Sequence, residues 1–146
     1  MPVPRTTLFA TAFVSLLWVT MAVPVAAQEI IPWDQLADIE FVQQDRQMVP
    51  SFSEEIQQLD GANVRLSGFM IPLEQTPEQR HFVLSAFPAA GCQFCIPGGP
   101  DTLVDVICED GIEFSYNRIS VEGRFELVED DPYGLVYRLT GAREVQ

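Results

Sequence analysis

The sequence contains no lysine, a single histidine and three cysteines. Each of these low counts limits the functions that the protein can have. Its 8 basic residues are all arginine and stand against 21 Asp and Glu residues, which gives a net charge of -13 at neutral pH. Such a surface repels the phosphates of nucleic acids and of anionic lipids. We therefore expect no nucleic-acid partner, and an acidic, solvated surface that favours solubility.

The sequence also lacks the motifs that mark common enzyme classes. It has no Gly-x-Ser-x-Gly segment and no phosphate-binding loop, and His81 is the one base available for a Ser-His-Asp triad. The acidic cluster of Glu126, Glu129, Asp130 and Asp131 lacks the Asp-x-Asp-x-Asp-Gly order of a calcium loop and is typical of a solvated turn. We expect a protein that is not an enzyme.

The first residues have the organisation of a secretory signal peptide. Arg5 precedes an apolar run over Leu8–Val23, and small residues follow up to Ala27. The run is short for a membrane-spanning helix, which needs about 20 apolar residues, so we favour cleavage over an uncleaved anchor. The expected mature protein begins at Gln28, is periplasmic and does not insert into a membrane.

The mature part is expected to form one domain with a helical leader over residues 28–60. A helix from Asp34 to about Gln44 would turn three apolar residues toward the core, namely Leu36, Ile39 and Val42. Pro50 then breaks the chain, and the capping-box spacing of Ser51–Glu54 predicts a second short helix that ends at about residue 60. We expect this leader to pack on the domain that follows.

Residues 61–146 carry the strand signals. The expected strands span residues 64–71, 81–87, 102–108, 119–128 and 135–139, with turns at 109–111 and 130–134. Glycines inside two of the strands permit sharp bending. About five bent strands in so short a section predict a mainly β fold, an OB-like antiparallel barrel, with an open sandwich as the alternative.

Cys92 and Cys95 stand two residues apart in a loop rich in Gly and Pro. Two thiolates at this spacing can bind one soft metal ion, and Cys108 on the next strand is a candidate third ligand. A site with only two or three thiolate ligands suits Cu(I) or transiently bound Zn²⁺ better than a permanent Zn²⁺ site. His81 begins the preceding expected strand, about 20 Å from the loop, so we do not expect it to be a ligand.

Two other interpretations of the thiols stay open. In an oxidising compartment a pair of cysteines usually forms a disulfide. Cys92 and Cys95 would then be joined, and Cys108 would be a small buried residue. The loop would then present an apolar surface to a membrane-protein partner, formed by Phe94, Ile96 and Pro97. A dithiol redox protein is the third interpretation, which the Pro and Gly residues after Cys95 disfavour because they oppose the helix that activates such thiols.

Four stretches of the sequence are typical of one family. The most specific is Gly-Phe-Met-Ile-Pro-Leu at Gly68–Leu73, inside the longer segment Leu59–Glu74; the others are Phe82–Leu84, Val121–Phe125 and Gly134–Leu139. Together they resemble the DUF3299 family of exported bacterial proteins over residues 30–146. The resemblance implies a small exported β-rich domain, and an association with metal-responsive transport systems of Gram-negative bacteria.

The Cys loop departs from the pattern of that family. Many members carry a Cys-Ile-His-type motif followed by prolines; here Cys92 matches its Cys, the His is absent and Cys95 is added. A ligand role of that His therefore does not transfer to this chain. The expected function is a non-enzymatic accessory or binding protein in periplasmic Zn or Cu handling, beside an ABC-type transporter or another inner-membrane protein.

Overall fold

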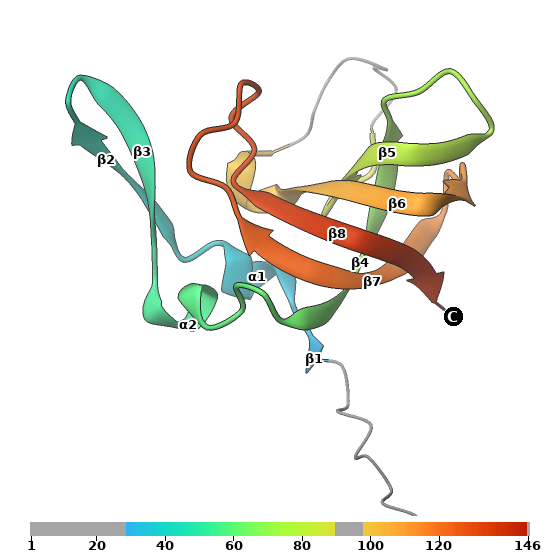
Figure 1. The fold of residues 1–146 in the computed structure, drawn as a ribbon, viewed down its shortest axis with the longest axis horizontal. Coiled ribbons are helices and arrows are strands. Elements are labelled where there is room, and N and C mark those ends of the chain that lie inside the picture. Colours follow the sequence, from blue (N-terminus) through green and yellow to red (C-terminus); the bar gives the residue numbers. More distant parts are fainter. Residues whose placement is uncertain (1–28, 90–97, 146) are drawn as a thin grey trace, which may run out of the picture.

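The structure is a computed structural model that describes residues 29–89 and 98–145. Five long strands form a closed barrel (Figure 1): β4 (Asn63–Pro72), β5 (Glu78–Ser85), β6 (Leu103–Glu113), β7 (Arg118–Leu127) and β8 (Tyr137–Val145). Their order is β4-β5-β6-β8-β7, and β7 pairs back with β4. The mainly β, OB-like barrel predicted from the sequence is confirmed. One barrel pair, β6 with β8, is parallel, whereas the prediction had antiparallel pairs throughout.

The barrel closes where β4 changes partners. Residues 63–69 of β4 pair with β7, and residues 69–72 pair with β5. Gly68 lies at this change, and a Cβ atom there would come within 2.5 Å of the backbone oxygen of Ser85. The glycine that the sequence places inside this strand is therefore required by the close approach of β5.

The inward faces of the strands follow the predicted alternation. On β6 the buried residues Val104, Val106 and Cys108 point into the core, as expected, and Val121 and Phe125 do so on β7. Strand β6 is longer than predicted, because Glu109–Gly111 is not a turn that ends it. The register between β5 and β6 shifts here, and these polar residues form a bulge within the strand.

The leader is less helical than predicted. It contains β1 (Glu29–Ile30) and two single-turn helices, α1 (Trp33–Leu36) and α2 (Glu54–Gln57), separated by a hairpin of β2 (Ile39–Gln44) and β3 (Gln47–Phe52). The expected helix to Gln44 is therefore wrong after residue 36, and Val42 is exposed. Strand β2 is followed by a tight turn, in which Asp45 and Arg46 both have positive φ, so the chain folds back as a hairpin.

The second leader helix lies where it was predicted, although its cap is Ser53 rather than Ser51. The Ser53 side chain accepts a hydrogen bond from the backbone of Ile56, and Ile56 is fully buried. Pro50 does not interrupt the chain but lies within β3. A proline is tolerated there because, in the described part of the chain, β3 pairs only with β2 and has a free edge.

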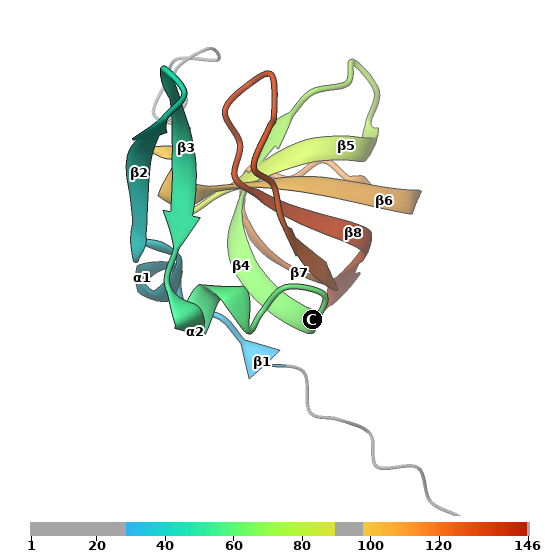
Figure 2. The same cartoon turned by 60° about the vertical axis from the view of Figure 1, so that its left-hand side comes forward.

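Two hydrogen bonds fix the helical part of the leader on the barrel. The hydroxyl of Tyr137 donates to the carbonyl oxygen of Leu36 at 2.7 Å, and the indole of Trp33 donates to that of Ser67 at 2.8 Å. Burial raises the pKa of Tyr137, so this donor keeps its proton. The hairpin, by contrast, extends beside the barrel as a separate arm (Figures 1 and 2). No helix within residues 29–89 and 98–145 is long and apolar enough to span a membrane.

Candidate functional site

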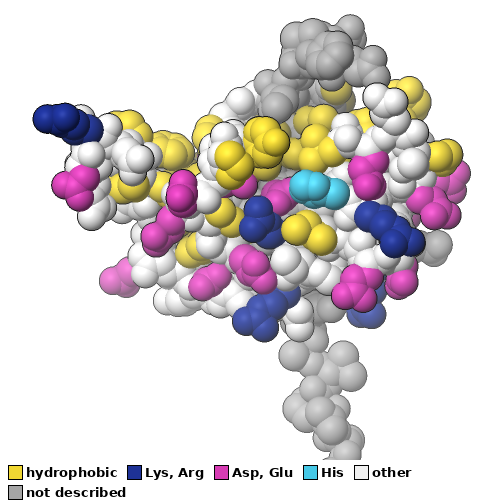
Figure 3. Space-filling view, turned by 45° about the horizontal axis from the view of Figure 1, so that its top comes forward, with side chains coloured by type: hydrophobic (Ala, Val, Ile, Leu, Met, Phe, Trp, Pro, Cys, Tyr) yellow, Lys and Arg dark blue, Asp and Glu magenta, His cyan; other side chains and the backbone are white. Residues whose placement is uncertain are grey.

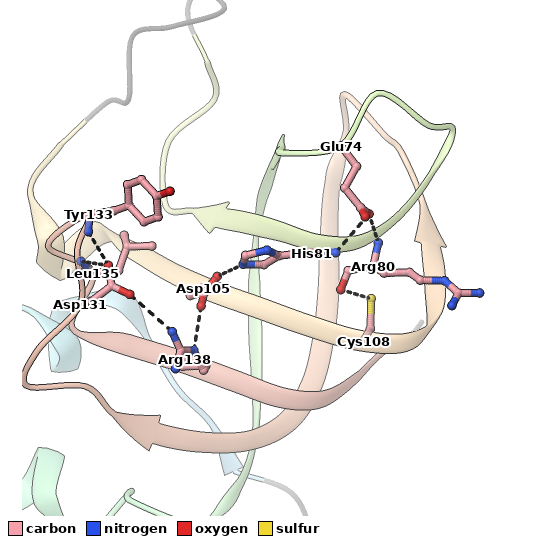
Figure 4. A network of polar contacts seen from close by, with 9 residues as sticks. All are labelled: Glu74, Arg80, His81, Asp105, Cys108, Asp131, Tyr133, Leu135 and Arg138. Carbon is pink, nitrogen blue, oxygen red and sulfur yellow. Dashed lines mark hydrogen bonds and ion pairs between the residues drawn. The ribbon is translucent and has the colours of Figure 1, made fainter.

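Three neighbouring strands place one polar side chain each on the same patch of the barrel's outer face. His81 on β5 pairs in register with Ile107 of β6, so Asp105, two residues earlier, is its diagonal neighbour. Asp105 also stands directly opposite Arg138 of β8. The β-sheet register alone therefore brings these three charged or titratable side chains together (Figure 4).

Asp105 is the centre of this network. Its side chain is only 4% exposed, and one carboxylate oxygen lies 2.6 Å from Nε2 of His81. The other oxygen accepts a hydrogen bond from Nε of Arg138 at 2.7 Å. A carboxylate removed from water needs such partners on both oxygens, because an unpaired buried charge is strongly unfavourable. Asp105 therefore holds the His81 ring in a fixed orientation.

The loop between β7 and β8 is joined to the same network. Asp131 in this loop lies 3.4 Å from the guanidinium of Arg138. Its other oxygen accepts hydrogen bonds from the backbone N–H groups of Tyr133, at 2.8 Å, and Leu135, at 3.3 Å. Asp131 thus orders the loop and connects it to Arg138.

The loop between β4 and β5 supports His81 from the other side. The carboxylate of Glu74 accepts hydrogen bonds from the backbone N–H groups of Arg80, at 2.6 Å, and His81, at 3.3 Å. The His81 ring itself points away from Glu74 and toward Asp105 (Figure 4). Both the backbone and the ring of His81 are therefore held by carboxylates from different elements.

The surroundings of His81 suit the recognition of a ligand. The His81 side chain is 50% exposed, and the exposed apolar or aromatic residues Ile107 and Tyr133 belong to the same strands and loops. Figure 3 shows the histidine among hydrophobic and charged side chains on an open face of the barrel. A few oriented polar groups within apolar surface are typical of a binding site. In OB-like barrels, the second and third strands and these two loops form the usual ligand face.

A second buried carboxylate lies on the face formed by β4, β7 and β8. Glu122 is 5% exposed and forms ion pairs with two arginines, with Arg65 at 3.2 Å and with Arg143. This cluster has the same plan as the first one, but both of its cationic partners are permanently charged. We refer to the two groups below as the Asp105 cluster and the Glu122 cluster.

The predicted cysteine ligands are only partly within the described chain. Cys92, Cys95 and the expected partner-binding residues Phe94, Ile96 and Pro97 lie outside the described residues. Cys108 is described, and it points into the barrel, where its thiol donates to the carbonyl oxygen of Gln79 at 3.1 Å. Burial raises the pKa of the Cys108 thiol, against a smaller opposing effect of a hydrogen bond to the backbone of Gly111.

Within residues 29–89 and 98–145, no three His, Cys, Asp or Glu side chains are grouped so that they could hold a metal ion. The ligand roles predicted for the cysteines stay predictions.

Sequence reasoning did not find the Asp105 cluster. The signal was present, because Asp105 interrupts an otherwise apolar strand and His81 lies on the strand joined to it by the Cys loop. What was missing was the register of β5 against β6 and the parallel pairing that brings Arg138 to Asp105. Neither can be read from residue spacing alone.

The fold and this face together define an OB-like barrel with a polar cluster on the outer face of β5, β6 and β8. The chain belongs to the DUF3299 family: the family model, described as a protein of unknown function, matches residues 21–139. The crystal structure of a DUF3299 family protein from Pseudomonas aeruginosa PAO1 is similar, with a TM-score of 0.56 and 18% identity. The match covers 82% of this chain and 97% of that one. No curated protein matches the chain.

Proposed function

We propose that this chain is an exported binding protein without catalytic activity, which handles Zn²⁺ or Cu(I) beside a transport system in the periplasm. One observation carries the proposal: the half-exposed His81 has its ring held by the buried carboxylate of Asp105 at 2.6 Å. The signal-like segment before Gln28 supports export. The acidic surface argues against the oligonucleotide binding seen in many OB-like barrels.

The geometry of His81 is that of a prepared metal ligand. A histidine that binds a metal usually donates a hydrogen bond from one ring nitrogen to a carboxylate or a carbonyl oxygen. This hydrogen bond fixes the ring and makes the other ring nitrogen a better metal ligand. Here Asp105 occupies Nε2, so Nδ1 is the nitrogen for a ligand. Arg138 holds Asp105 in turn. Imidazole is a good ligand for zinc and copper, and so are thiolates.

The additional donors are proposed to be Cys92 and Cys95. They lie in the connection between β5 and β6, the two strands that carry His81 and Asp105. His81 is four residues from the end of β5 at Ser85, about 13 Å along the strand. Cys92 is seven residues beyond Ser85, and an extended chain of that length reaches about 23 Å. The connection is therefore long enough for both thiolates to reach the imidazole.

Cys108 is not included in the proposed ligand set. Its side chain is 3% exposed and belongs to the core cluster inside the barrel, whereas His81 and Asp105 lie on the outer face of the same sheet. Burial also raises the pKa of its thiol, which opposes the thiolate form that binds metal. Cys108 is therefore a suitable control position for substitutions of the other two cysteines.

The proposal is tested by counting free thiols and measuring bound metal on protein purified without a chelator. We expect reduced Cys92 and Cys95 and about one equivalent of Zn or Cu. Cys95→Ser and His81→Ala should each lose the metal, while Cys108→Ser should keep it. One disulfide with no metal, even after reduction and titration with Zn²⁺ and Cu⁺, would overturn the proposal and favour a stapled loop that docks a membrane protein through Phe94, Ile96 and Pro97.

A further inference from the structure

A groove separates the β2–β3 arm from the loop that joins β7 to β8. Its volume is about 490 Å³, and its walls come from these two segments. The residues on which the argument rests are Phe41, Met48 and Pro50 on the arm, and Glu129, Asp130 and Leu135 on the loop. The groove lies outside the Asp105 cluster, although Asp131 belongs to both.

One face of the arm is mostly apolar. The register pairs Ile39 with Phe52 and Phe41 with Pro50, and the next pair on that face joins Gln43 to Met48. Ile39 and Phe52 pack against the barrel core at the base of the arm. Further out, Phe41 is 41% exposed and Met48 is 62% exposed. A two-stranded ribbon is only marginally stable alone, so an apolar face that extends beyond the core is suited to a partner.

The opposite wall of the groove is acidic. Glu129 and Asp130 are both exposed at its rim. Figure 3 shows hydrophobic side chains along the arm and acidic side chains next to the space between the arm and the barrel. This combination favours a ligand that is both apolar and positively charged. A second copy of the chain is disfavoured because its net charge of -13 would repel this rim.

We propose that this groove binds an apolar, basic segment of a partner protein. The apolar side chains of that segment pack on Phe41, Met48 and Pro50, and its Lys or Arg side chains face Glu129 and Asp130. The bound segment then lies between the arm and the loop. The contact of Asp131 with Arg138 orders the loop. Such a partner segment is positively charged, opposite in sign to the net charge of this chain.

The test uses the whole purified chain and a short fluorescent peptide in which Leu alternates with Lys. Two further peptides serve as controls, one with Glu in place of Lys and one with Ser in place of Leu. The rim variant is Glu129→Lys with Asp130→Lys. Its matched control is Glu109→Lys with Asp110→Lys, which changes the same charge at two adjacent exposed residues on the β6 bulge. Binding is followed by fluorescence anisotropy at low and high salt.

The Leu–Lys peptide should bind, more weakly at high salt, and neither control peptide should match it. The rim variant should weaken binding by about tenfold while the matched control leaves it unchanged. Met48→Asp should weaken it as well, through the apolar wall. Equal binding to the rim variant and its control would overturn the proposal. So would concentration-dependent dimerisation that Met48→Asp abolishes, because the occupant would then be a second copy.

Discussion

The Asp105 and Glu122 clusters are built alike and differ in one partner. Each has a carboxylate that is at most 5% exposed, held by two basic side chains from neighbouring strands on the outside of the barrel. Glu122 has two arginines, which keep their charge at every pH the protein meets. Asp105 has Arg138 and the half-exposed His81. We infer that the Glu122 cluster stabilises the pairing of its strands. The Asp105 cluster does the same and also contains a group able to bind a ligand.

The position of the two clusters reinforces the difference. The Asp105 cluster lies on β5, β6 and β8 and is connected through Asp131 and Glu74 to the loops at either side. The Glu122 cluster joins β4, β7 and β8, and Arg65 and Arg143 are its partners from the adjoining strands. Binding sites of OB-like barrels use the former kind of position. Matched substitutions in the two clusters can therefore separate structural effects from functional ones.

The largest expected effect is the loss of either buried carboxylate. Asp105→Ala and Glu122→Ala should each lower the free energy of unfolding by about 2–4 kcal/mol, because two basic side chains lose the carboxylate that they share and a strand contact is lost. The partly exposed arginines can turn to water, which keeps the loss below that of a fully buried pair. Urea denaturation measures both values.

The control for this pair is Asp110→Ala, an exposed acidic residue on the same strand as Asp105, which should change stability by less than about 0.5 kcal/mol. A change of that size in Asp105→Ala as well would show that the Asp105 cluster contributes no net stability. The shared structural role of the two clusters would then be contradicted.

The next largest effect is on metal affinity. It is expected when His81 is replaced by Arg, so that Asp105 has two arginine partners as Glu122 does. His81→Arg keeps a basic side chain beside Asp105 but removes the ring nitrogen available to a ligand. We expect metal affinity to fall by at least about tenfold while stability changes by less than about 1 kcal/mol. Isothermal titration with Zn²⁺ and urea denaturation of the same sample give both quantities. Unchanged affinity would remove His81 from the proposed site.

A smaller effect is expected for the exposed partner in each cluster. His81 is 50% exposed and Arg143 is 73% exposed, so water and salt screen both ion pairs. His81→Gln and Arg143→Gln should each cost less than about 1 kcal/mol, and less still at high salt. A loss several times larger for His81→Gln alone would indicate that His81 is a structural residue, contrary to the comparison.

The smallest effect concerns Cys108, which shares β6 with Asp105 but faces inward. Burial raises the pKa of its thiol in the folded protein. The unfolded chain therefore releases this proton first as the pH rises above about 8.5, and folding stability falls there. In Cys108→Ala this part of the alkaline loss should be absent. Urea denaturation of both proteins at neutral and alkaline pH measures it, and equal slopes would contradict a buried, protonated thiol.

The barrel was predictable because its strands alternate clearly and its glycines lie where strands bend. Gly68 is an example: the sequence shows a glycine within an apolar strand, and the structure shows the close approach of β5 that needs it. The β2–β3 hairpin was missed because Leu36, Ile39 and Val42 recur every three residues, which is the spacing of a helix. Only the pairing with Gln47–Phe52, which begins after the unusual Asp45–Arg46 turn, decides between them.

The candidate site was not predictable to the same degree. The sequence analysis weighed His81 only against the Cys loop along one strand, so the neighbours of His81 on the adjacent strand were not considered. The contact of His81 with Asp105 depends on strand register, and that of Asp105 with Arg138 depends on residues 33 positions apart in a parallel pair. Long-range pairing of this kind leaves no local pattern in a single sequence.

The most direct test of the comparison is a competitive Zn²⁺ titration of three reduced proteins: the natural chain, Asp105→Asn and Glu122→Gln. Each substitution removes one buried negative charge and keeps the shape of the side chain. The account predicts that Asp105→Asn weakens zinc binding by about 10- to 100-fold, because the His81 ring loses its orienting carboxylate. It predicts that Glu122→Gln binds zinc as the natural chain does. Equal affinities for all three proteins, or no zinc binding by the natural chain, would contradict it.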